Sequence, residues 1–237
     1  TKLVIAISSR ALFNLDHSHQ IFKDEGINAY AKHQQENEQV ILEPGVGFTL
    51  VKKLLKLNSK KTPIDVILLS RNSADTGLRI FNSIEHYGLN ISRAAFTRGE
   101  STHPFVGAFE ADLFLSSNYN DVQKALKSGY AAASIIESKS NHSHPSQLRI
   151  AFDGDAVIFS DESEKIFQEK GLEAFHENEV LSEKIKLKAG PFKSFLVSLQ
   201  KIQSTFPEEN NPIRTALVTA RSAPAHKRVI HTMREWG

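Results

Sequence analysis

Short apolar runs alternate along the chain with longer stretches in which apolar residues recur at helical spacing. The short runs predict strands, and the first reads as a fully buried parallel strand because all of its positions are apolar. The predicted strands are residues 3–7, 66–69, 94–96, 114–115, 133–136, 148–152 and 215–218. The predicted helices are residues 19–34, 45–57, 74–86, 121–129, 162–171, 190–203 and 223–236. Strands that alternate with helices indicate the α/β class with parallel sheets. Gly26 is expected to break the first helix, and Gly88 to end the third.

This pattern occurs twice. A shift of 145 residues, rising to 149 after a short insertion, superimposes the second half of the chain on the first. Matched pairs include Ile5/Ile150, Gly26/Gly171, Gly45/Gly190, Ser70/Thr219, Arg79/Arg228 and Tyr87/Trp236. Two unrelated βα units would have apolar residues at similar spacings, but they would not have glycines at the same positions. We therefore predict tandem Rossmann-like units at residues 1–137 and 148–237, joined by a polar linker at 138–147.

The two predicted units differ in extent. The first continues well past Gly88, whereas the second stops at Gly237, the residue that matches Gly88. We therefore expect the second unit to be incomplete at its C-terminus. Its charged helical segment at residues 161–189 is expected to form a small cap, with Phe167, Leu172 and Phe175 on the buried face.

Composition narrows the classes of function. The chain has 237 residues, of which 40% are hydrophobic and 24% charged, as in an ordinary globular protein. The 29 basic and 27 acidic residues nearly cancel, so no cationic field favours a nucleic-acid polymer as partner. No apolar run approaches the roughly 20 residues that span a bilayer, which argues against a membrane partner. Cysteine is absent, which excludes disulfides and thiolate chemistry and suits a cytoplasmic protein. The pattern predicts no particular oligomeric state.

Candidate chemistry lies at the end of the strand that opens the second unit. Asp153, Gly154 and Asp155 follow this strand directly, and ligands of open α/β sheets bind beyond the carboxyl ends of strands. Two neighbouring carboxylates repel each other unless a cation lies between them, and Mg²⁺ prefers carboxylate oxygens. We expect Gly154 to turn the backbone so that both residues approach one centre. The alternative is an ordinary turn, in which Asp and Gly are common.

A second strand of this unit ends in hydroxyl and basic groups. Thr219, Ala220, Arg221 and Ser222 lie between the strand and the next predicted helix. Hydroxyl groups, free backbone N–H groups and a guanidinium at such a place can bind a phosphate. The alternative is that Thr219 is a core hydroxyl and Ser222 a helix cap.

These motifs resemble those of the haloacid dehalogenase superfamily. Asp153, Asp155 and Val157 match its D-x-D-x-[TV] motif, and Thr219 matches its second motif. Three longer strings resemble the cytosolic 5′-nucleotidase I family over essentially the whole chain. They are AISSRALF at residues 6–13, FDGDAVIFSDESE at 152–164 and LVTARSAPA at 217–225.

The resemblance implies Mg²⁺-dependent hydrolysis of nucleoside 5′-monophosphates such as AMP. Asp153 would be the nucleophile and would form an aspartyl phosphate, while Asp155 would be the general acid and base. The Asp153 carboxylate and the Asp155 backbone carbonyl would hold Mg²⁺, and residues 219–222 would bind the phosphate. The lysine and acidic-pair motifs of the superfamily are expected after Gly237, so this chain alone should be weakly active or inactive.

The first unit lacks this chemistry at the matching positions. Ser8 and Arg10 stand where Asp153 and Asp155 do, which predicts a non-catalytic copy. Arg10 and Asn72 are weaker candidates for nucleotide contacts, as is Phe159, whose alternative is core packing. Two other functions stay open: a haloacid dehalogenase-type phosphatase of another small phosphate ester, and a non-catalytic nucleotide-binding module.

Overall fold

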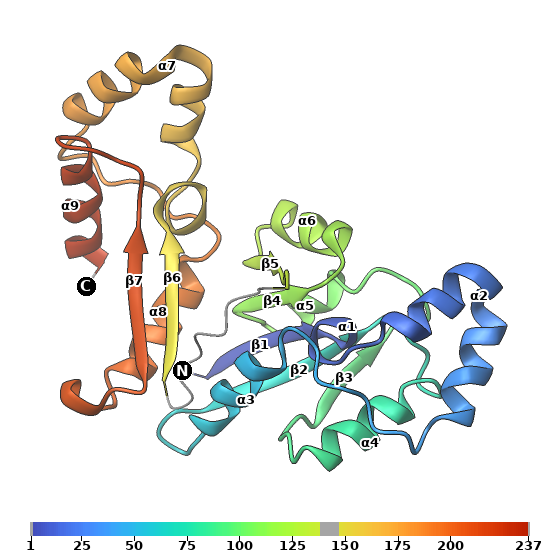
Figure 1. Ribbon diagram of the computed structural model, residues 1–237. Helices are drawn as coiled ribbons and strands as arrows, with labels where there is room; N and C mark the ends of the chain where they lie inside the picture. The colour runs from blue at the N-terminus through green and yellow to red at the C-terminus, as the bar shows by residue number, and fades with distance from the viewer. Residues whose placement is uncertain (1, 138–146, 237) are drawn as a thin grey trace.

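The computed structural model describes residues 2–137 and 147–236, and it shows an α/β protein with two parallel sheets (Figure 1). Five strands form one sheet in the order β3-β2-β1-β4-β5, and β6 pairs with β7 in a second. The strands are β1 Leu3–Ser8, β2 Ile64–Ser70, β3 Arg93–Phe96, β4 Leu113–Ser116, β5 Ala132–Ser134, β6 Leu148–Asp153 and β7 Ile213–Val218. The predicted α/β class with parallel strands is therefore confirmed.

Helices connect the strands. They are α1 Ser9–Leu12, α2 Asp16–Glu36, α3 Phe48–Lys56, α4 Leu78–His86, α5 Pro104–Ala108, α6 Tyr119–Lys127, α7 Glu162–Leu181, α8 Lys193–Gln203 and α9 His226–Trp236, with short turns η1 Gly154–Ile158 and η2 Glu208–Asn210. The sequence pattern did not predict α1 and α5, because four or five residues are too few to show a helical period. Except for Gln147, the predicted linker lies outside the described residues.

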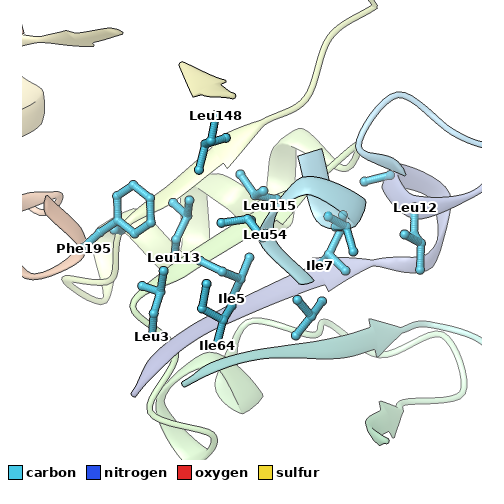
Figure 2. Packing of buried hydrophobic residues seen from close by; sticks show 14 of the residues in the cluster. Leu3, Ile5, Ile7, Leu12, Leu54, Ile64, Leu113, Leu115, Leu148 and Phe195 are labelled. Carbon is cyan, nitrogen blue, oxygen red and sulfur yellow. The ribbon is translucent and has the colours of Figure 1, made fainter. Parts of the chain in front are cut away.

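The core has one hydrophobic cluster on each face of the five-stranded sheet. Leu3, Ile5 and Ile7 of β1 point into the larger cluster, while Val4 and Ala6 point into the smaller one beneath α5 and α6. The larger cluster continues into the second sheet through Leu148 and Phe195, as Figure 2 shows. The two sheets therefore share one core, as expected when each sheet must bury an apolar face.

The two sheets pair their opening strands in the same register. Leu3 lies opposite Ile64 in the first sheet, and Leu148 lies opposite Ile213 in the second. Figure 1 shows a long bent helix beyond the carboxyl end of each opening strand, α2 in the first unit and α7 in the second. Each helix bends at a glycine in the left-handed region, Gly26 with φ +85° and Gly171 with φ +81°. The expected break at Gly26 is confirmed.

The second sheet is less protected than the first. Every residue of β7 after Ile213 is exposed, whereas β1 is buried almost throughout because β2 and β4 flank it. In α7, Phe167 is 44% exposed and Leu172 57% exposed. The prediction of a buried face was wrong for these two residues, whereas Phe175 is partly buried and its ring centroid lies 5.4 Å from the Arg221 guanidinium carbon.

Gly190 occupies a position that has no room for a side chain. Its N–H donates to the Ile158 carbonyl, and a Cβ atom would lie too close to the carbonyl oxygens of Val157 and Phe159. Gly45, its match in the first unit, is similarly crowded, since a Cβ there would lie 2.9 Å from the Ala11 carbonyl oxygen. This crowding gives the matched glycines a packing role.

We expect Gly190→Ala to destabilise the protein by about 1–3 kcal/mol or more, because backbone atoms must move to admit the methyl group. Gly154→Ala is the control, since its Cβ would meet its nearest neighbours at 3.5–3.6 Å, an ordinary contact. Urea unfolding measures both. Equal stability of the two variants would contradict the packing role of Gly190.

Candidate active site

Asp153 is the last residue of β6, and its exposed carboxylate is free. It lies opposite Val218 of β7, so Thr219 follows on the neighbouring strand at the same edge of the sheet. Among the described residues, no side chain forms a hydrogen bond or ion pair with the Asp153 carboxylate. A free, solvent-accessible carboxylate at a strand end is available to an incoming ligand.

The turn after Asp153 differs from the expected one. Gly154 is not in the left-handed region, and the residue that is there is Ala156, with φ +59°. This conformation costs an alanine about 1 kcal/mol or more. Asp155 is extended, with φ −78° and ψ 136°, and the turn closes when the Phe159 N–H donates to the Gly154 carbonyl. The prediction that Gly154 makes the turn was therefore wrong.

The Asp155 carboxylate is bound by Arg221. The Arg221 Nε lies 3.0 and 3.1 Å from the two carboxylate oxygens, so the contact is a close charged pair. The Arg221 side chain is only 2% exposed, and its Nη1 donates to the Glu179 carboxylate. Burial by itself lowers the Arg221 pKa, but hydrogen bonds and charge from Asp155 and Glu179 outweigh it and raise the pKa. Arg221 is thus a permanent cation between two carboxylates.

Glu179 connects this pair to the rest of the second unit. Its fully buried carboxylate accepts hydrogen bonds from Ser163 Oγ at 2.8 Å and from Arg228 Nη1 at 3.0 Å. Arg228 also donates to the Ile185 carbonyl at 2.7 Å. The network joins α7, the loop after β7 and α9 behind the candidate site. The sequence analysis missed Glu179, although the repeat had already matched Arg228 with Arg79.

The Thr219 segment forms a polar loop rather than a helix start. The Thr219 Oγ1 accepts a hydrogen bond from the Arg221 backbone N–H at 3.2 Å, while Ala220 and Ser222 are exposed. Helix α9 begins at His226, later than predicted, and a cis peptide bond joins Ala223 to Pro224. Ser222 lies four residues ahead of His226, and its carbonyl accepts a hydrogen bond from the His226 N–H at 3.3 Å.

Phe159 lies in the core. Its side chain is 0% exposed and packs 5.4 Å from the Trp236 ring, measured between centroids. This burial leaves no ring face for a nucleotide base, so core packing is the role that the structure supports. Arg10 and Asn72 lie apart from Asp153, just after β1 and β2 in the first unit.

The donor set fits Mg²⁺ only in part. Within residues 2–137 and 147–236, no group of three or more His, Asp or Glu side chains is arranged to hold a metal ion. The Asp153 carboxylate is free, and the ion pair with Arg221 leaves Asp155 its backbone carbonyl as a ligand. Mg²⁺ in proteins is often held by one or two carboxylates, with water and substrate phosphate completing its shell. The exposed Asp153 carboxylate suits that mode of binding.

The hydrogen bonds behind the candidate site recur in the first unit with neutral partners. Gln34 stands where Glu179 does: it accepts from Ser18 Oγ at 3.4 Å and from Arg79 Nη1 at 3.1 Å. Asn72 stands where Arg221 does, and its backbone N–H donates to Ser70 Oγ at 3.2 Å. The same local structure therefore forms with and without buried carboxylates.

The fold and this site describe an α/β protein with an exposed carboxylate at a strand end. The chain belongs to the 5′-nucleotidase family, whose model matches residues 1–237. It is 39% identical over 249 residues to human cytosolic 5′-nucleotidase 1B, an alignment that covers 99% of this chain and 41% of that protein. The chain therefore spans less than half the length of this relative.

No solved structure matches the chain significantly. None of the described helices has the length and apolar character needed to cross a bilayer.

Proposed function

We propose that this chain carries the nucleophile and part of the phosphate site of a cytosolic hydrolase of nucleoside 5′-monophosphates, with AMP-like substrates. The observation that carries the proposal is the free Asp153 carboxylate beside the Thr219 loop in a chain of the 5′-nucleotidase family. The human relative is named a cytosolic 5′-nucleotidase, and this name supports the proposed substrate class and location.

Asp153 attacks the phosphorus atom in the proposed reaction. A bond forms between a carboxylate oxygen and phosphorus, the ribose 5′ oxygen leaves, and an aspartyl phosphate results. Water then cleaves this intermediate and regenerates the carboxylate. The Thr219 hydroxyl and the exposed backbone of Ala220 bind the non-bridging oxygens. Mg²⁺, held by Asp153 and the Asp155 carbonyl, would reduce the repulsion between the carboxylate and the phosphate.

Asp155 is the proposed general acid and base, which donates a proton to the leaving oxygen and later takes one from water. The Asp155 carboxylate accepts hydrogen bonds from Arg221 Nε at 3.0 and 3.1 Å, so it faces the guanidinium and not an incoming substrate. This role therefore requires the Asp155 side chain to turn away from Arg221 when substrate arrives. Arg221 then loses its contact with Asp155, keeps its contact with Glu179, and becomes able to contact the phosphate.

We also infer that the two units are copies of one ancestral unit of haloacid dehalogenase type. The shared strand register, the matched bends at Gly26 and Gly171 and the recurring hydrogen bonds support this inference. Helix α7 is the proposed cap, since it lies beyond the carboxyl ends of β6 and β7 (Figure 1). The first unit has Ser8 at the position of the nucleophile and is proposed to be non-catalytic.

A substrate panel tests the proposed function. We expect phosphate release from AMP, IMP and deoxynucleoside monophosphates to exceed release from sugar phosphates at least tenfold, and EDTA to abolish it because Mg²⁺ is required. The assay uses the full protein as it occurs in the cell. Preference for sugar phosphates would identify another phosphatase, and binding of AMP without turnover would identify a binding module.

A further inference from the structure

The first unit carries a cationic counterpart of the candidate site. The second unit places three carboxylates and two guanidinium groups there, from Asp153, Asp155, Glu179, Arg221 and Arg228. The matching residues of the first unit supply two guanidinium groups and no carboxylate: Ser8, Arg10, Gln34, Asn72 and Arg79. An anionic phosphate needs a metal ion to approach the second unit, whereas it can approach the first unit directly.

Arg10 and Asn72 lie close to contacts that join the ends of β1 and β2. Ser9 Oγ lies 3.1 Å from Ser70 Oγ, which also accepts the Asn72 backbone N–H at 3.2 Å, so Arg10 and Asn72 lie at the same edge of the first sheet. Tyr30 supports this placement: its hydroxyl donates to Asn72 Oδ1 at 2.7 Å, and the charge of Arg10 acts on its pKa. Both side chains therefore lie near Tyr30, beyond the carboxyl ends of β1 and β2.

Both side chains hold a buried donor that the protein does not satisfy. Arg10 Nε and Asn72 Nδ2 are buried and have no acceptor among the described residues. A buried donor without a partner destabilises the protein, and a ligand oxygen would relieve this cost. Tyr30 fixes the Asn72 amide: burial raises the Tyr30 pKa, so its hydroxyl stays protonated and donates to Oδ1, which leaves Nδ2 as the free group.

The contacts that would compete with an anion for Arg10 are weak. Arg10 Nη2 lies 3.1 Å from Asp16, whose side chain is 81% exposed, and exposed pairs contribute about 0–1 kcal/mol. Arg71, the next cation at this edge, is held by Asp121 through Nε at 2.9 Å and is not available. Arg10 and Asn72 are therefore the donors that an anion would use.

We propose that the first unit binds a phosphate group between Arg10 and Asn72. The bound group is not hydrolysed, because Ser8 replaces the carboxylate nucleophile and Arg10 replaces the acid and base. The inference does not require the second unit to be active.

The test is a titration of the 237-residue chain with inorganic phosphate in EDTA, followed by NMR of the Arg10 Nε–H and the Asn72 side-chain amide. Without a metal ion, the carboxylates of the second unit repel phosphate, so the titration reports the first unit alone. We expect both signals to shift and to saturate with one dissociation constant. A parallel titration with AMP distinguishes a free phosphate site from one that prefers an ester, which would bind more tightly.

Two variants and a control complete the design. Arg10→Gln and Asn72→Leu are each expected to weaken phosphate binding at least tenfold, while their circular dichroism and unfolding midpoints show that they fold. Arg214→Gln removes an exposed arginine of β7 and should leave binding unchanged. Equal weakening in Arg10→Gln and Arg214→Gln would indicate a general charge effect and overturn the proposal. Unshifted Arg10 and Asn72 signals would also overturn it.

Discussion

Replacing Asp153 with asparagine should lower the rate of phosphate release from AMP by at least about 10³-fold, the scale seen when a catalytic nucleophile is removed. The amide has nearly the same shape as the carboxylate but cannot form the aspartyl phosphate. The Asp153 side chain is exposed and has no partner among the described residues, so folding should be unaffected to within about 0.5 kcal/mol. Steady-state phosphate release and urea unfolding measure the two effects.

Asp153→Ser is the matched second variant, because serine is the natural residue at the corresponding position of the first unit. It should be as inactive as Asp153→Asn and equally well folded. A variant that keeps a tenth or more of the activity would show that Asp153 is not the nucleophile. The phosphate site at Arg10 would be unaffected by that outcome.

Glu179→Ala should lower the free energy of unfolding by about 3–5 kcal/mol, the cost of removing one partner of a buried ion pair. It leaves the buried Arg221 and Arg228 guanidinium groups without their shared carboxylate. Glu179→Gln should cost less, because Gln34 satisfies Ser18 and Arg79 at the corresponding position of the first unit. Urea unfolding of the three proteins gives the differences.

Glu183→Gln provides the control for this series. Glu183 pairs with Lys227 at 3.8 Å on a partly exposed surface, where a salt bridge contributes about 0–1 kcal/mol. If Glu179→Ala were no more destabilising than Glu183→Gln, the buried network would not hold the second unit together. An equal effect of Glu179→Ala and Glu179→Gln would show that the negative charge of Glu179, and not its hydrogen bonds, provides the stability.

The sequence predicted the elements but not their exposure. Apolar runs were enough to locate β1 and β2, because a strand buried on both faces is apolar throughout. The apolar run of β6 located it as well, although β7 is its single strand neighbour among the described residues. The exposure of β7 was not predictable. An apolar run shows that a strand could be buried, but it does not show whether another element covers that strand. The left-handed Ala156 was missed for a related reason: glycine is the usual residue there, and Gly154 was the obvious choice.

The sequence predicted which residues form the candidate site, but it did not predict which side chains they bind. Asp153, Asp155 and Thr219 were found because motifs at strand ends are local in sequence. The partners of Arg221 were not found, because Glu179 lies 42 residues earlier on another element. Nothing in the charged pattern of that helix marks one glutamate as buried. The internal repeat could have indicated that Glu179 pairs with Arg228, since Gln34 matches Glu179 and Arg79 matches Arg228.

The narrow β6–β7 sheet affects how this chain behaves in solution. Within the described residues, each of its two strands has a single strand neighbour, so both outer edges present unpaired backbone N–H and C=O groups. Such edges are templates on which a strand from another molecule can pair. Leu217 and Val218 add an apolar surface along one edge. Concentrated samples of this chain should therefore self-associate through this sheet before any other part of the protein, unless another polypeptide covers it.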